Sequence, residues 1–173
     1  MPKFLKLAML SFAVMTAVLH AQEPAKARPH FLPEVNLGGM PYCQIELAVT
    51  PEELRHGLMD RAYLAEDGGM LFFYGAPKIT AFWMKNTLLP LDVIFLDAQG
   101  VVLQVTTMPV EPPRGTAETE EAYERRLKSY SCPRPVTSAL EIKAGRAMEL
   151  GLEPGTQIPE LALRALLHNI IAN

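Results

Sequence analysis

Two apolar runs separated by a polar step constrain the fold of this chain more than any other feature. The runs are residues 81–84 and 91–96, and the step between them contains Lys85, Asn86 and Pro90. Each run is typical of a buried strand, and Pro90 rules out one uninterrupted strand because proline cannot donate a ladder hydrogen bond. The sequence therefore predicts two strands joined by a polar elbow (residues 83–90), which begins at the only tryptophan, Trp83.

Further strand and turn signals predict a β-rich domain. Residues 43–49 alternate between apolar and polar, residues 70–74 are dense in aromatic side chains, and residues 97–100 form a turn signal between apolar runs. These patterns predict strands, and a tight turn between two strands favours antiparallel pairing. A threonine followed by Pro51 and Glu53 predicts the start of a capped helix. We therefore expect an α+β, β-rich fold: a compact, mostly antiparallel sheet or small barrel with a few short helices and a C-terminal helix.

The two ends of the chain differ in character from this domain. Lys3 and Lys6 precede an apolar stretch, and Ala21 supplies a cleavage point, which is the organisation of a secretory signal peptide. The predicted boundaries are a signal peptide at 1–21, a flexible linker at 22–41, and a single β-rich domain at 42–173, with a core at 42–158 and an amphipathic C-terminal helix at 159–172. We expect an extracytoplasmic protein (periplasmic or secreted) with no stable membrane span after signal cleavage.

The charge balance and the cysteines narrow the classes of partner and cofactor. With 16 basic and 19 acidic residues, the chain has a formal net charge of −3 at pH 7, which argues against nucleic acid as a partner. Cys43 and Cys132 are compatible with a disulfide or with two separate thiols, and the sequence leaves both alternatives open. The scattered methionines are expected to fill gaps in the core rather than hold copper, so neither a metal site nor a cofactor is predicted.

Residues 109–135 form a separate, charged stretch that has prolines at both ends and is rich in glutamate and arginine. Glu121 and Arg125, and likewise Glu124 and Lys128, stand at i,i+4 spacing. This pattern predicts a solvated helix or a mobile excursion. Its charged face is expected to have no specific partner.

A set of short motifs extends from about Tyr42 to Ile158. The motifs are Gly57-Leu58-Met59, Gly69-Met70-Leu71-Phe72, Phe82-Trp83-Met84-Lys85-Asn86-Thr87, Pro90-Leu91-Asp92, Ala139-Leu140-Glu141, and Gly151 with Gly155. Together they resemble the uncharacterised, often exported family called domain of unknown function 192. The resemblance implies a compact, β-rich single domain with no established activity, so it transfers no catalytic role. The chain departs from the family pattern at residues 111–128, at Thr156 and in its helical tail.

Six residues are candidates for a ligand site near one end of the sheet: Arg61, Trp83, Lys85, Asn86, Asp92 and Glu141. In the functional interpretation, Trp83 stacks on a ring while Lys85 and its neighbours bind a sugar or an anionic group. In the structural interpretation, Asn86 bonds to the elbow backbone, and Lys85 or Arg61 pairs with a carboxylate. We expect Trp83 to be largely covered and Lys85 to be available for binding.

The pattern of polar residues also limits the activities to expect. Histidine is scarce, so nucleophilic catalysis by serine or cysteine is not predicted. The sequence favours an exported, non-catalytic binding or accessory module of the cell envelope, with a glycan, a small anionic ligand or an envelope protein as partner. The alternative is an envelope hydrolase that acts on glycans through paired carboxylates. Carboxylates that face each other across a pocket would favour the hydrolase, and an aromatic and basic surface would favour the binding module.

Overall fold

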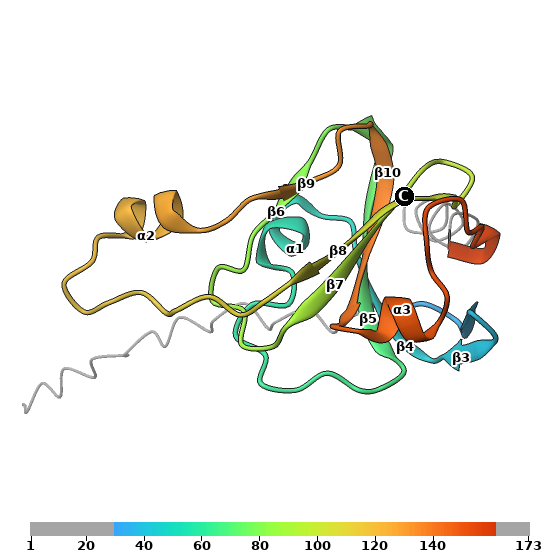
Figure 1. Cartoon of the computed structure of the whole chain (residues 1–173), viewed down its shortest axis with the longest axis horizontal. Coiled ribbons are helices and arrows are strands. Elements are labelled where there is room, and N and C mark those ends of the chain that lie inside the picture. Colours follow the sequence, from blue (N-terminus) through green and yellow to red (C-terminus); the bar gives the residue numbers. More distant parts are fainter. Residues whose placement is uncertain (1–29, 162–173) are drawn as a thin grey trace, which may run out of the picture.

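The structure, a computed structural model, describes residues 30–161 and is organised around a six-stranded sheet (Figure 1). In order across the sheet, the strands are β1 (His30–Phe31), β4 (Gln44–Ala48), β5 (Gly68–Lys78), β10 (Val136–Lys143), β7 (Leu91–Leu96) and β8 (Val102–Met108). The remaining elements are the helices α1 (Pro51–His56), α2 (Glu120–Arg126) and α3 (Arg146–Glu149) and the short strands β2 (Val35–Leu37), β3 (Met40–Tyr42), β6 (Ala81–Phe82) and β9 (Tyr130–Ser131).

The pairing of the strands confirms the expected α+β, β-rich fold with a mostly antiparallel sheet. Among the described strands of the large sheet, β4 and β5 are parallel, and every other pair of neighbours is antiparallel. The sheet is open, with β1 and β8 at its edges, so the barrel alternative is not realised in this part of the chain.

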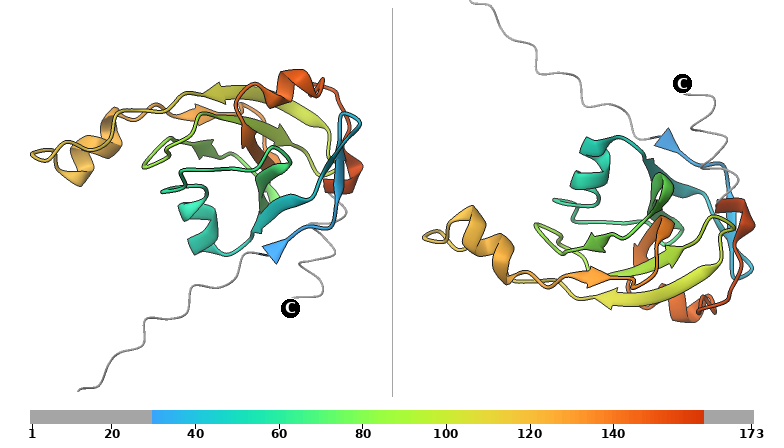
Figure 2. Two further views of the ribbon diagram at one scale, coloured as in Figure 1. Left: turned by 90° about the horizontal axis from the view of Figure 1, so that it is seen from below. Right: turned by 90° about the horizontal axis from the view of Figure 1, so that it is seen from above.

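Both faces of the sheet are covered, because successive side chains of a strand point to opposite faces. On one face, Leu140 and Ile142 of β10 pack in a core with side chains from β2, β3 and α3. On the other face, Ala139 packs with side chains from β6 and β9, and Leu54 of α1 packs against the same core. Figure 2 shows α1 and α3 on opposite sides of the sheet. This double coverage explains why β7 and β10 are buried along nearly their whole length.

The domain begins earlier than predicted, because residues 30–41 are part of the fold and not a flexible linker. Val35 and Leu37 are fully buried, and the strands on either side of Gly38-Gly39 pair as a hairpin. The proline and glycine content of this segment concealed an apolar alternation that is only three residues long. The prediction of a linker at 22–41 is therefore wrong from residue 30 onward.

The helix and the hairpin that the sequence predicts are confirmed. Before α1, the Thr50 hydroxyl accepts a hydrogen bond from the N–H of Glu53 (3.2 Å), and the Glu53 carboxylate accepts one from the N–H of Thr50 (2.9 Å). This capping box fixes the start of the helix. β7 and β8 pair across the turn at Asp97, whose carboxylate accepts hydrogen bonds from the N–H groups of Gln99 and Val101.

The predicted segments at the two ends lie partly outside the described residues. The predicted signal peptide at 1–21 and residues 22–29 of the predicted linker lie outside the described residues. Residues 159–161 are helical, as predicted for the C-terminal helix, and the rest of that predicted helix also lies outside the described residues. No helix within residues 30–161 is long and apolar enough to cross a membrane.

The two cysteines are free thiols, so the disulfide alternative is not realised. Cys43 is exposed, and its sulfur lies 3.6 Å from a carboxylate oxygen of Glu34. Cys132 is buried in the core on the α1 side of the sheet. The two thiols stay apart because one faces solvent at the start of β4 and the other packs inside that core.

α2 lies on an arm (residues 109–129) that connects β8 to β9 and projects beyond the sheet (Figures 1 and 2). The helix itself is confirmed, and Thr119 caps its N-terminus. Arg126 pairs with Glu118 and donates hydrogen bonds to the carbonyl oxygens of Pro112 and Pro113. These contacts fold the arm back on itself.

Gly38→Ala should destabilise the domain more than Gly39→Ala. Gly38 has a left-handed φ of +57°, and a Cβ at this position would lie 2.0 Å from the carbonyl oxygen of Leu150. A Cβ at Gly39, at a φ of +86°, would meet nothing within 4 Å, so this control carries backbone strain alone. In urea unfolding we expect losses of about 2–4 kcal/mol for Gly38→Ala and about 1 kcal/mol for Gly39→Ala. Equal losses would show that the close approach to Leu150 is not required.

Candidate functional site

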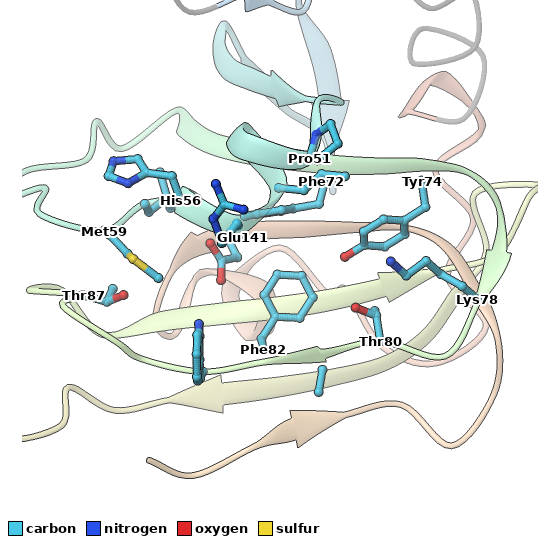
Figure 3. A pocket seen from close by; sticks show the side chains of 16 residues that line it. Pro51, His56, Met59, Phe72, Tyr74, Lys78, Thr80, Phe82, Thr87 and Glu141 are labelled. Atoms are coloured by element: carbon cyan, nitrogen blue, oxygen red, sulfur yellow. The ribbon is translucent and has the colours of Figure 1, made fainter. Parts of the chain in front are cut away.

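A pocket of about 430 Å³ opens on the α1 side of the sheet. Its walls come from α1 and the loop after it, from β5, and from residues 80–83, while Glu141 of β10 reaches it from the sheet. Figure 3 shows the Glu141 carboxyl between Met59 and Phe82, with Tyr74 and Lys78 together at another side of the pocket. The volume is within the range of pockets that hold small molecules.

Glu141 faces the pocket because of the register of its strand. It is paired with Met70 of β5 and Val93 of β7, and it shares their face of the sheet. Only 5% of the residue is exposed, and no hydrogen bond or ion pair within residues 30–161 holds its carboxyl. Because an ionised carboxylate is costly in such surroundings, burial raises the pKa of Glu141 to about 8. The side chain is therefore mostly protonated at neutral pH.

Aromatic rings and cations line the same pocket as this carboxyl. Phe72 and Phe82 pack edge to face with ring centroids 5.0 Å apart, and they form an apolar wall. The Lys78 ammonium lies 4.6 Å from the ring centroid of Tyr74. Burial raises the pKa of Tyr74 to about 12, so its phenol stays neutral. Arg55 of α1 also lines the pocket. The arrangement can hold a ring between apolar faces and can attract an anion.

Two of the six predicted site residues, Trp83 and Glu141, line the pocket. The prediction that Trp83 would be largely covered is wrong, because 37% of it is exposed while its neighbours Phe82 and Met84 are buried. Adjacent residues of an extended segment point to opposite sides, so burying Phe82 and Met84 turns Trp83 outward. Trp83 is thus the ring of the elbow that a ligand can reach.

Lys85 is not available for binding, contrary to the prediction. Its side chain is 17% exposed, and its ammonium pairs with the carboxylates of Glu120 (2.5 Å) and Glu124 (2.6 Å) on α2. Hydrogen bonds to these carboxylates raise the pKa of Lys85 above its ordinary value. The functional interpretation therefore loses Lys85 as its main cation.

α2 also holds the middle of the elbow through Asn86. This residue has a left-handed φ of 50°, and its N–H donates a hydrogen bond to the Tyr123 hydroxyl (3.0 Å). The hydroxyl in turn donates to the side-chain oxygen of Asn86 (3.4 Å), and Tyr123 is 1% exposed. The prediction that the charged helix has no specific partner is therefore wrong. Composition shows that a helix is charged, but not which part of the fold it faces.

Arg61 also lies apart from the pocket and has a structural partner. Its guanidinium forms a two-bond ion pair with Glu46 of β4, in which Nη2 lies 2.6 Å from Oε2. Glu46 is nearly buried, whereas the Arg61 side chain is 35% exposed. Arg61 therefore pairs with a carboxylate, as the structural interpretation expects. The partner is Glu46, however, and not Asp92 or Glu141.

Asp92 lies on the opposite face of the sheet from Glu141, because Glu141 is in register with its neighbour Val93. The Asp92 carboxylate is buried and accepts hydrogen bonds from the Thr107 hydroxyl (2.6 Å) and from the N–H of Ala147 in α3 (3.0 Å). It ties α3 to the sheet. The six predicted residues therefore do not form a single cluster.

Sequence reasoning missed most of the pocket. Phe72 and Tyr74 were predicted as strand residues only, and Arg55, His56 and Lys78 were not singled out. The available signal was the aromatic alternation of β5, since alternate residues of a strand line one face. The position of α1 above that face was not available, because it depends on long-range packing. No group of three or more His, Cys, Asp or Glu side chains within residues 30–161 is placed to hold a metal ion.

The fold and the site define a β-rich α+β domain in which one buried acid faces an aromatic pocket. The chain belongs to the DUF192 family (Uncharacterized ACR, COG1430), whose model matches residues 34–159. The resemblance to domain of unknown function 192 is thereby confirmed. Comparison with curated proteins finds no match.

The crystal structures that are similar to this chain include those of two other proteins. One is a Sinorhizobium meliloti 1021 protein with the provisional name of transcription regulator; it has a TM-score of 0.58 and 29% sequence identity, over 77% of this chain and 95% of that chain. The other is a protein of unknown function from Novosphingobium aromaticivorans DSM 12444, with a TM-score of 0.57 and 28% identity, over 84% of this chain and 98% of that chain.

Glu141→Gln should remove a pH-dependent loss of stability. The pKa of Glu141 is about 8 in the folded parent, whereas a glutamate in the unfolded chain has its ordinary pKa of 4.5. The free energy of unfolding should therefore fall as pH rises between these values, by about 1.4 kcal/mol per unit relative to Glu141→Gln, and should level off above them. Urea unfolding of both proteins from pH 4 to 9 measures the difference. Parallel pH profiles would show that Glu141 is ionised in the folded protein.

Proposed function

We propose that the protein is an exported, non-catalytic binding module of the cell envelope and that its pocket holds a glycan or a small anionic ligand. The observation that carries the binding function is the Glu141 carboxyl, which lines the pocket and has no partner among residues 30–161. The carboxyl is open to the pocket, so a ligand there would supply the hydrogen-bond partner that the fold does not provide. Trp83 and Tyr74 add aromatic surfaces on which a ring can stack.

The hydrolase alternative has one observation in its favour. A carboxyl with a raised pKa, such as Glu141, suits a general acid. Glycan hydrolysis needs a second carboxylate, however, and Glu141 is the single acidic residue among the described residues that line the pocket. Glu46 lies on the same face two strands away, which places it ~10 Å from Glu141, with Met70 between them and Arg61 bound to it. This arrangement supports binding better than hydrolysis.

The proposed export rests on the N-terminal sequence, where Lys3 and Lys6 precede an apolar stretch and Ala21. Cleavage after Ala21 would produce a mature chain that begins at Gln22. We expect the intact mass of exported protein to match residues 22–173. Recovery of the full chain from the cytoplasm alone would reject the export.

Binding can be followed through Trp83, because it is the only tryptophan and it lines the pocket. We expect short oligomers of glucose or N-acetylglucosamine to change Trp83 fluorescence in a saturable way. Tyr74→Ala should weaken this binding about tenfold, because the ring loses its stacking surface. Tyr63→Ala is the matched control, since Tyr63 is 73% exposed and is not among the pocket residues.

Two outcomes of this experiment would contradict the proposal. Equal effects of the Tyr74 and Tyr63 substitutions would show that the ligand binds elsewhere. Mass spectrometry of the oligomers after incubation tests catalysis, and the appearance of shorter oligomers would favour the hydrolase.

A further inference from the structure

The charged side chains that line the pocket are mainly cationic. Arg55 comes from α1 and Lys78 comes from β5, whereas Glu141 is the single acidic residue among the described residues of the lining. The chain as a whole has a net charge of −3, so this lining differs in sign from the protein around it. Cations that line a concave site raise the local concentration of anions.

Glu141 contributes a hydrogen-bond donor to this cationic site. Its carboxyl is protonated at neutral pH and has no partner within residues 30–161. A protonated carboxyl donates one O–H bond, and such a bond to an anionic oxygen is short and strong. An ionised Glu141 would instead repel an anion at the same place. The acid therefore fits an anionic acceptor in its protonated form.

The aromatic side chains determine what the anionic group is attached to. Trp83 is 37% exposed and Tyr74 lines the same pocket, so both present ring surface to a ligand. The apolar CH face of a sugar ring packs well against such surfaces. We infer that the pocket, in its proposed binding function, holds sugars with an anionic group, either a carboxylate or a phosphate, and that Glu141 donates its proton in a hydrogen bond to that group.

This assignment predicts a specific dependence on pH. The titratable groups that line the pocket with Glu141 are Arg55 and His56 from α1 and Tyr74 and Lys78 from β5, and Glu46 on the same face of the sheet is held by Arg61. The pKa of Glu141 is about 8. Affinity for an anionic sugar should therefore fall up to tenfold per pH unit above that value, as the donor is lost and a repelling charge forms.

Three matched probes test the ligand class on the mature protein: glucose, glucuronate and glucose 6-phosphate. They share a sugar ring and differ in the group attached to it, and Trp83 fluorescence reports occupancy of the pocket. We expect at least one anionic sugar to bind more than tenfold tighter than glucose, and the ratio of the two anions identifies carboxylate or phosphate as the preferred group. If glucose binds as tightly as both anions, the inference fails while the binding function stands. If none of the three binds, both the inference and sugar binding in this pocket are rejected.

Variants test whether Glu141 and the cations recognise the anion. Both proteins in this comparison carry His56→Asn, which removes the imidazole of the pocket lining. In the protein that keeps Glu141, the affinity for the preferred anion should fall above pH 8. With Glu141→Gln, which keeps a neutral donor, the affinity should stay constant from pH 7 to 9.5. Lys78→Gln should weaken anion binding about fivefold or more. Lys143 lies outside the pocket lining, so the control Lys143→Gln should leave anion binding unchanged. Identical pH profiles with and without Glu141 would overturn the inference.

Discussion

The register between β10 and its neighbours is the constraint on which the rest of the structure depends. Alternate residues of β10 send Leu140 and Ile142 into one core and Ala139 and Glu141 to the other face. A Cβ at Gly69 would lie 2.6 Å from the carbonyl oxygen of Glu141, so the close pairing of β5 with β10 requires glycine there. A shift of one residue would exchange the two sets of side chains and place a carboxyl in the core beneath α3. The pairing that builds both cores therefore also places the acid of the pocket.

The elbow connects the pocket to the arm. Trp83 lines the pocket, and the Lys85 ammonium lies 5.5 Å from its ring centroid while it pairs with two carboxylates of α2. Ion pairs between partly exposed groups contribute little stability on their own. The buried Tyr123, which bonds to both the backbone and the side chain of Asn86, gives the contact its specific geometry. The arm thus positions one wall of the pocket without contributing a residue to the described lining.

Local patterns predicted the elements well, and long-range pairing accounts for what they could not predict. The capping box before α1 and the alternation in β4 are properties of a few adjacent residues, so both were visible in the sequence. The position of β10 between β5 and β7 depends on residues that are far apart in the chain. The contact of α2 with the elbow depends on such residues too. The site prediction failed for the same reason. Asp92 and Glu141 each border a strand, but only the register shows that they face opposite sides.

A single neutral acid in a pocket has consequences different from those of an acid pair. Neighbouring strands place Met70 and Val93 beside Glu141, and neither can satisfy a carboxyl, so an apolar residue at position 141 would pack there without the cost of an unpaired polar group. This cost is the physical reason for proposing a role of the acid in recognition. The described lining contains no second carboxylate, which the two-carboxylate mechanism of glycan hydrolysis requires. As a neutral donor Glu141 can nevertheless distinguish a ligand oxygen that accepts a hydrogen bond from one that does not, and that distinction is sufficient for a binding protein.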